Sequence, residues 1–184
     1  MTVNNLNKKN LGIIKFEKKI DKRGFFQRVF CKKKFSKVLA NENINQVNRS
    51  FTKKKGSIRG MHFQYFPKAE KKIILCIKGR IWDVVVDLRK NSKTFLKYRS
   101  EILSEKNSKA LYIPKGYAHG FQTLTNDCEL LYFHTEYYDK RNEDGLNPFD
   151  KKIAIKWPLK VTNISKRDMS FEGIDNNFAG YNFK

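Results

Sequence analysis

The residues with the clearest chemical use in this chain are its three histidines, because an imidazole gains or loses a proton near neutral pH. His62 stands in "SIRGMHFQ", three positions after Arg59 and two before Gln64. In a pocket, such an imidazole could take a proton from a substrate as a general base. The stretch fits a hydrogen-bonded histidine of an ordinary core equally well. By itself it leaves both interpretations open.

Four other side chains could share a pocket with His62. His119 in "YIPKGYAHGFQ" comes just after a Pro-Lys-Gly turn, where it could line a pocket wall or belong to the turn. Tyr132 and Tyr138 in "LLYFHTEYY" share parity on an extended strand, although tyrosines in strands usually serve packing. Asp168 follows Ser165 by three residues, which also matches a helix capping box. Each pattern alone is therefore ambiguous.

The histidines and cysteines do not have the spacing of a metal site. Small β-barrels often bind a metal through an H-x-H pair, but His62 is followed by Phe-Gln and the other two histidines are isolated. Cys31, Cys76 and Cys128 are scattered and form no C-x-x-C pair, so neither a disulfide framework nor a zinc knuckle is indicated. We expect no metal and no cofactor.

Most of the chain has the pattern of short β-strands. Residues 72–88 are two apolar runs joined at Lys78-Gly79, which predicts a β-hairpin, and the second run places Asp83, Val85 and Asp87 on one face. Strands are also expected over 110–124, 129–134 and 153–157, and helices over 33–42 and after Ser165. This pattern predicts an all-β, jelly-roll barrel with short flanking helices, and the length of 184 residues indicates one domain over residues 1–184.

A barrel strand directs its side chains alternately to the interior and the exterior. If residues 58–64 form a regular strand, Gly60, His62 and Gln64 share one face, and Gly60 leaves space beside the imidazole. Arg59 then points the other way, unless a bulge near Gly60 turns it inward.

The net charge of +21 is the strongest compositional signal. Lysines near phosphates would favour nucleic-acid binding, but here they form doublets and triplets spread along the chain and do not concentrate on one face. We therefore expect no nucleic-acid partner, although the positive field would attract small polyanions. No apolar run of about 18 residues and no apolar leader occur, so a cytoplasmic protein without a membrane partner is expected.

Several stretches together resemble one family, the cupin-type dTDP-sugar 3,5-epimerases typified by dTDP-4-dehydrorhamnose 3,5-epimerase. The resemblance runs in order from about residue 10 to residue 170. It is carried by "DKRGFF", "QVNRS", "IRGMHFQ", "GRIWDVVVDLRKNSKTF", "YIPKGYAHGF", "LLYFHTEYY" and "IAIKWPL". The resemblance implies a cupin-like jelly roll and a metal-independent isomerase that inverts C3 and C5 of a nucleoside-diphosphate 4-keto-6-deoxy sugar, a reaction of rhamnose, lipopolysaccharide or capsule synthesis.

The same resemblance assigns roles to four residues. His62 is expected to be the general base and Asp168 its partner, since a carboxylate on one imidazole nitrogen leaves the other free to accept a proton. Lys72 matches the lysine beside the C4 keto oxygen, where an ammonium stabilises the enolate. Tyr132 matches the tyrosine that returns a proton on the opposite face of the sugar ring.

The implied contacts with the sugar nucleotide are Arg23, Phe26, Gln46, Asn48, Arg59, His119 and Tyr138. An arginine fork suits diphosphate oxygens. The family also implies a homodimer whose subunits exchange strands near the active site. One departure concerns the nucleotide: Gln27-Arg28 stands where the family usually has Phe-Glu, which leaves the base open.

Four alternatives remain at this point. The enzyme could invert C3 alone, or act on another 4-keto sugar nucleotide such as a GDP-linked heptose. It could be a sugar-nucleotide 3,4-ketoisomerase on the same barrel. It could also be a basic carbohydrate- or nucleic-acid-binding barrel without catalytic activity.

Overall fold

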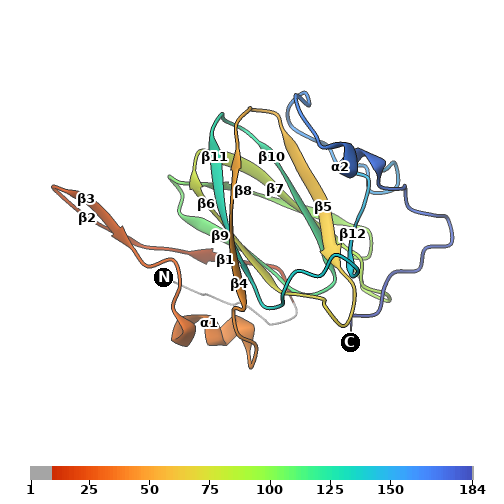
Figure 1. Cartoon of the computed structure of the whole chain (residues 1–184), viewed down its shortest axis with the longest axis horizontal. Helices are drawn as coiled ribbons and strands as arrows, with labels where there is room; N and C mark the ends of the chain where they lie inside the picture. The colour runs from red at the N-terminus through yellow and green to blue at the C-terminus, as the bar shows by residue number, and fades with distance from the viewer. Residues whose placement is uncertain (1–9, 184) are drawn as a thin grey trace.

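Two five-stranded antiparallel sheets face each other in the computed structural model, which describes residues 10–183 (Figure 1). The first sheet has the order β1 (Gly12–Lys15), β9 (Lys109–Ile113), β6 (Lys72–Lys78), β11 (Cys128–His134) and β4 (Gln46–Thr52). The second has the order β12 (Glu143–Gly145), β5 (Ile58–Gln64), β10 (Tyr117–Thr123), β7 (Arg80–Asp87) and β8 (Tyr98–Ser104). The prediction of an all-β barrel is confirmed.

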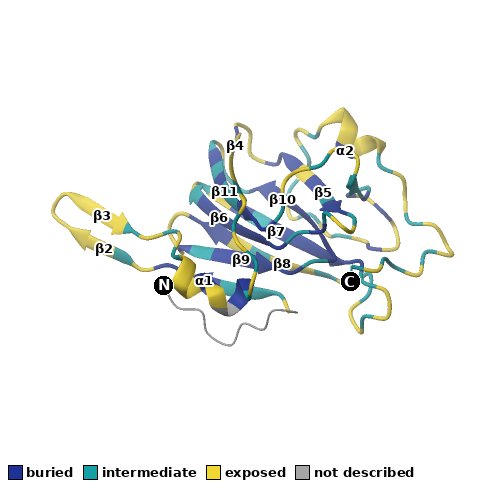
Figure 2. Ribbon diagram, turned by 60° about the horizontal axis from the view of Figure 1, so that its bottom comes forward, coloured by how far each residue is buried: buried dark blue, intermediate teal, exposed yellow. Residues whose placement is uncertain are grey.

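The remaining elements flank the barrel. Strands β2 (Lys18–Asp21) and β3 (Gly24–Gln27) form a hairpin that projects away from it, and Figure 2 shows this hairpin as largely exposed. The two helices are α1 (Lys32–Leu39) and α2 (Lys166–Ser170), which confirms both predicted helical segments. In the part of the chain that the structure describes, no helix is both long and apolar enough to cross a membrane.

The central strands of both sheets are covered on both faces, whereas the edge strands β4 and β8 leave Val47, Phe51 and Ile102 exposed. Between the sheets, apolar side chains of β6, β7, β9, β10 and β11 form one core cluster. On the outer face of the first sheet, α1 packs through Phe35, Val38 and Leu39. On the outer face of the second sheet, segments that follow Gly145 in the chain cover Met61, Val84 and Val86. Burial on both faces explains why β6 and β7 are nearly continuous apolar runs.

Two predictions of local structure are wrong. The two runs of residues 72–88 are not a hairpin, because β6 lies between β9 and β11 in one sheet and β7 between β10 and β8 in the other. The turn at Gly79, with φ of +77°, carries the chain between the sheets. Residues 153–157 are not a strand: the backbone N–H groups of Lys152 and Ile153 donate to Asp150 and not to a neighbouring strand. The alternating side chains there still pack on the core.

Strand β5 contains the bulge that brings Arg59 to the same side as His62. His62 pairs with His119 and Arg59 pairs with Phe121, so three steps along β5 match two along β10. Gly60 has φ of +122°, and a Cβ there would lie 2.5 Å from Gly120 Cα. The space that Gly60 leaves is therefore taken by the backbone of β10 and not by the surroundings of the imidazole.

We expect Gly60→Ala to lower the free energy of unfolding by about 3 kcal/mol or more, because it adds a Cβ to a left-handed backbone and to a close interstrand contact. Urea unfolding would measure this. Gly24→Ala is the matched control, since Gly24 has φ of +132° and a Cβ added there would meet nothing within 4 Å. It carries the backbone cost alone, about 1 kcal/mol. Equal losses in the two variants would show that the contact with Gly120 contributes nothing.

Candidate active site

A cavity of about 630 Å³ lies between the two sheets and is lined from both of them and from the segment that leads into α2. On the first sheet its lining follows from strand register. Alternate residues of β4, β11 and β6 face inward in rows across the sheet. The rows are Gln46, His134 and Lys72; Asn48, Tyr132 and Ile74; and Ser50, Leu130 and Cys76. The polar members of these rows, apart from buried Cys76, line the cavity.

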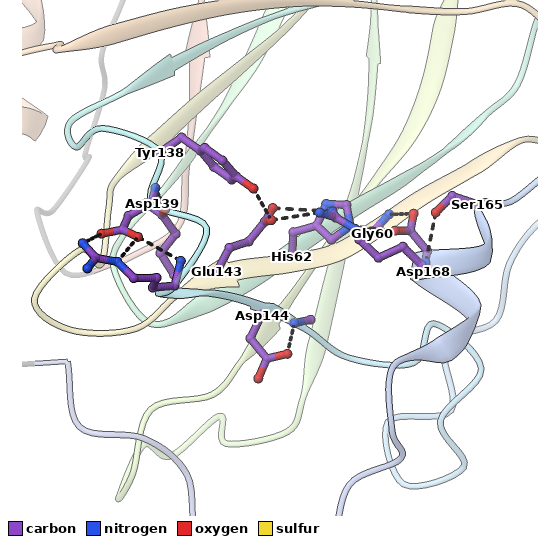
Figure 3. A network of polar contacts seen from close by, with 12 residues as sticks. Gly60, His62, Tyr138, Asp139, Glu143, Asp144, Ser165 and Asp168 are labelled. Atoms are coloured by element: carbon purple, nitrogen blue, oxygen red, sulfur yellow. Dashed lines mark hydrogen bonds and ion pairs between the residues drawn. The ribbon is translucent and has the colours of Figure 1, made fainter.

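His62 on β5 and Asp168 on α2 form a hydrogen-bonded pair on the other side of the cavity. His62 Nε2 lies 2.9 Å from Asp168 Oδ1, and Asp168 Oδ2 accepts from the Gly60 N–H at 3.1 Å (Figure 3). Ser165 caps α2 by accepting from the Asp168 N–H at 3.0 Å. Ser165 is therefore the N-cap of α2, while the Asp168 carboxylate bonds Gly60 and His62 and does not return to Ser165 as in a full capping box.

The electrostatics of this pair keep the carboxylate ionised. Burial raises the pKa of Asp168, but the hydrogen bonds from His62 and Gly60 and the charge of His62 outweigh burial and lower the pKa to about 2. An ionised Asp168 accepts from Nε2–H, which leaves His62 Nδ1 as the nitrogen that can take up a proton.

A chain of polar contacts connects His62 to Tyr138. Arg167 pairs with Glu143 at 2.8 Å, and the Tyr138 hydroxyl donates to Glu143 at 3.0 Å. Arg167 Nη2 also lies 2.9 Å from His62 Nε2. A guanidinium can only donate, so this contact requires that His62 Nε2 carries no proton. The hydrogen bond to ionised Asp168 requires the other tautomer, in which Nε2 carries the proton.

His119 is not a turn residue. It lies within β10, it is 5% exposed, and its Nε2 contacts both carboxylate oxygens of Asp83 at 3.0 and 2.9 Å. Asp83 is fully buried, and burial raises the pKa of this carboxyl although the charge of His119 acts in the opposite direction. The pair holds the imidazole of His119 against the cavity.

Tyr132 presents a neutral phenol to the same cavity. Burial raises the pKa of its hydroxyl above the ordinary value. The Ser50 hydroxyl donates to the Tyr132 oxygen at 3.3 Å. The Tyr132 ring lies edge-on to His119 and stacks on His134, with centroids 6.3 and 6.1 Å apart respectively. A phenol that remains protonated can donate a proton to a carbon above it.

Lys72 is held in an ion pair at the start of β6. Its Nζ lies 3.0 Å from Glu70 Oε1, and Glu70 Oε2 lies 2.7 Å from His134 Nδ1. All three side chains are nearly buried and line the cavity. Burial raises the pKa of Glu70, but the charges and hydrogen bonds of Lys72 and His134 outweigh burial and bring the pKa below its ordinary value. The carboxyl is therefore ionised.

The structure brings nine of the eleven predicted site residues to one cavity. These are His62, Tyr132, Lys72, Asp168, Gln46, Asn48, Arg59, His119 and Tyr138. Arg23 and Phe26 do not line the cavity: both are exposed on the projecting β2–β3 hairpin, where Arg23 pairs with Asp21. Their expected contact with a sugar nucleotide stays a prediction, as do the roles given to the other nine.

Sequence reasoning missed the charged partners of these residues. Asp83 and Glu70 carried a usable signal: Asp83 is a carboxylate inside an apolar run, and Glu70 lies two positions before Lys72, on the same side of an extended chain. Glu143 and Arg167 are ordinary charged residues of short elements and carried none. His134 was considered only as a metal ligand. Within residues 10–183, no group of three or more His, Cys, Asp or Glu has an arrangement that could hold a metal ion.

We expect the stability difference between the wild type and Asp168→Asn to depend on pH. A carboxyl whose pKa is lowered by folding stabilises the protein while it is ionised, above about pH 4, and that contribution is lost as the pH falls toward 2. The shift from 3.8 to about 2 corresponds to about 2 kcal/mol. Urea unfolding of both proteins between pH 5 and pH 2 would measure it. A difference that stays constant over this range would contradict the lowered pKa.

Comparison with known proteins places these features in a known family. The family model described as dTDP-4-dehydrorhamnose 3,5-epimerase matches residues 6–176. The dTDP-4-dehydrorhamnose 3,5-epimerase of Shigella flexneri is 37% identical over 161 residues, which cover 86% of this chain and 88% of that protein. The dTDP-4-dehydrorhamnose 3-epimerase of Streptomyces niveus is 32% identical over 153 residues, which cover 83% and 73%.

A solved structure agrees with the fold. The crystal structure of dTDP-4-dehydrorhamnose 3,5-epimerase from Bacillus anthracis, with TDP and pyrophosphate bound, superimposes with a TM-score of 0.88 at 37% identity. The match covers 94% of this chain and 99% of that one. The cupin-like form of the barrel is thereby confirmed.

Proposed function

Because the chain belongs to the dTDP-4-dehydrorhamnose 3,5-epimerase family, we propose that its cavity inverts C3 and C5 of dTDP-4-dehydro-6-deoxy-D-glucose, giving dTDP-4-dehydro-L-rhamnose. The observation that carries this proposal is the placement of two proton-transfer groups on facing walls. His62 comes from the second sheet and Tyr132 from the first, and both line one cavity that also contains Lys72.

Each inversion is a proton removed from one face of the ring and a proton returned to the other. His62 Nδ1 takes the proton from the carbon next to the C4 ketone, and the electron pair of that C–H bond moves to the C4 oxygen as an enolate. The ammonium of Lys72 stabilises this negative charge. Tyr132 then gives its proton to the opposite face of the carbon while the carbonyl re-forms. His62 and Tyr132 regain their starting states through proton exchange with water.

The nucleotide end of the site is proposed from charge and position. Arg59 lies beside the cavity, with its Nε donating to Thr52 at 2.9 Å, and its fork suits diphosphate oxygens. The β2–β3 hairpin, with Arg23 and with Phe26 62% exposed, would complete the same end of the cavity in a partner subunit of a homodimer. Sedimentation at twice the mass of the 21.8 kDa chain would support this arrangement, and a monomer that is fully active would contradict it.

A second candidate is inversion at C3 alone, or action on another 4-keto sugar nucleotide such as a GDP-linked heptose. The relative from Streptomyces niveus is a 3-epimerase, and the Gln27-Arg28 pair departs from the family at the nucleotide end.

The test is solvent exchange with a panel of substrates. Purified protein in heavy water is given TDP-, GDP- and CDP-linked 4-keto sugars, and deuterium uptake is followed by mass spectrometry and NMR. Deuterium at C3 and C5 with inversion of the TDP-linked sugar is expected. Uptake at C3 alone would indicate the 3-epimerase, and movement of the carbonyl would indicate a ketoisomerase. Binding without any uptake would overturn the enzymatic function.

A further inference from the structure

We propose that Glu70 and His134 are positioning residues that hold Lys72 and Tyr132 in one fixed arrangement, so that enolate stabilisation and opposite-face protonation occur at the same ring. This proposal rests on the proposed function. The two residues lie outside the catalytic set described above. Through their contacts at the cavity wall, they connect the ammonium of Lys72 to the phenol of Tyr132.

Glu70 uses both of its carboxylate oxygens inside the site. Oε1 lies 3.0 Å from Lys72 Nζ and Oε2 lies 2.7 Å from His134 Nδ1. The Glu70 side chain is 7% exposed, and those of Lys72 and His134 are each 11% exposed. A lysine side chain has four flexible torsions, so an anion that is itself fixed is what gives the ammonium one position.

His134 performs two tasks with different parts of its ring. Its Nδ1–H donates to Glu70, which fixes the carboxylate. Its flat face stacks on the ring of Tyr132, with centroids 6.1 Å apart and planes inclined by 15°. Strand register makes both contacts possible, because His134 lies opposite Lys72 across β11 and β6 and two positions after Tyr132 on β11. At its other nitrogen it has a long contact of 3.5 Å with Asn48.

The two tasks predict two different kinetic defects. An ammonium that has lost its fixed anion stabilises the C4 enolate less well, so proton removal slows at both carbons. The Tyr132 phenol without the stacked ring of His134 points less well at the carbon of the sugar ring that it must protonate. The enolate then regains its proton from the face that lost it, and deuterium enters without inversion.

Three substitutions separate these tasks. Glu70→Gln keeps the shape of the side chain and removes its charge. His134→Phe keeps the stacking on Tyr132 and removes the Nδ1–H. His134→Gln keeps a hydrogen-bond donor and removes the ring.

We expect Glu70→Gln and His134→Phe to lower kcat for deuterium exchange by about tenfold to a hundredfold, with KM within about twofold and with the ratio of inversion to exchange unchanged. We expect His134→Gln to exchange at nearly the wild-type rate and to invert about tenfold less often per exchange event. In Glu70→Gln/His134→Phe the two losses should not add, since both variants release the same ammonium.

Glu101→Gln is the matched control. Glu101 pairs with Lys109 outside the cavity, so its loss also breaks an ion pair between a glutamate and a lysine. It should leave the rate and the ratio unchanged. Thermal unfolding and dTDP binding of every variant identify any general loss of structure.

The wild type in the same series separates two kinds of failure. A wild type that exchanges neither carbon contradicts the proposed function, and this proposal with it. A wild type that inverts normally, beside variants that match it in rate and in ratio, contradicts only the roles of Glu70 and His134. The same holds if kcat, dTDP binding and thermal stability fall together in all three variants, since that is the result of a purely structural role.

Discussion

His62→Asn is expected to lower deuterium exchange at C3 and at C5 by about a thousandfold or more, because it removes the base that takes the proton. Asparagine has a similar width and its amide can still donate to Asp168, which His62 contacts at 2.9 Å. An amide nitrogen has no lone pair that accepts a proton near neutral pH. Exchange measured by NMR in heavy water, with dTDP binding measured by calorimetry, would show the loss of chemistry with binding kept within about threefold.

His119→Asn is the comparison for this experiment. His119 pairs in register with His62 across β10 and β5 and lines the same cavity, but it is held by Asp83 and is assigned to binding. Its substitution should raise KM more than it lowers kcat. If His62→Asn exchanged at the wild-type rate, or if His119→Asn alone abolished exchange, the base would be assigned to the wrong histidine.

The second large effect is expected from Tyr132→Phe. Deuterium should continue to enter the sugar while inversion falls by about a hundredfold, because the variant lacks the acid that protonates the opposite face. The ring remains, and with it the contacts to His119 and His134, so the shape of the cavity is kept. NMR of the product, compared with total deuterium by mass spectrometry, gives the ratio of inversion to exchange.

Ser50→Ala is the control for Tyr132→Phe. Ser50 donates to the Tyr132 hydroxyl at 3.3 Å, so the phenylalanine variant also breaks this contact. Ser50→Ala should reduce inversion only slightly. An equal effect of both substitutions would move the proton donor from the phenol to the serine or to a water that it holds.

The sequence was informative where a single strand carries the signal. The residue pattern located β6, β7, β9, β10 and β11 but not β1 to β4, β8 or β12, and it predicted Tyr132 on the strand that became β11. The strand that contains His62 was expected as well. A bulge that turns Arg59 inward was one of the two expected possibilities, because Gly60 permits the unusual backbone conformation. These features depend on neighbours within a few residues.

Contacts between strands that are distant in sequence were not accessible in the same way. Two apolar runs joined by a glycine look the same in a hairpin and in a corner between two sheets, so β6 and β7 were paired incorrectly. The partnership of Asp83 with His119 requires the register of β7 against β10, which no local pattern specifies. For the same reason His134 was not connected to Glu70, which lies 64 positions earlier.

The extra residue in β5 also determines which parts of this protein can change length. Arg59 and His62 owe their common orientation to one irregular step in the ladder, opposite Gly120. Loops at the ends of the barrel can grow or shrink without altering that step. Gain of a residue between positions 59 and 62 would set four steps of β5 against two of β10 and enlarge this irregularity, whereas loss of one would restore regular pleating with both side chains still on one face. We therefore expect the protein to tolerate insertions in the loops at the ends of the barrel but not between Arg59 and His62.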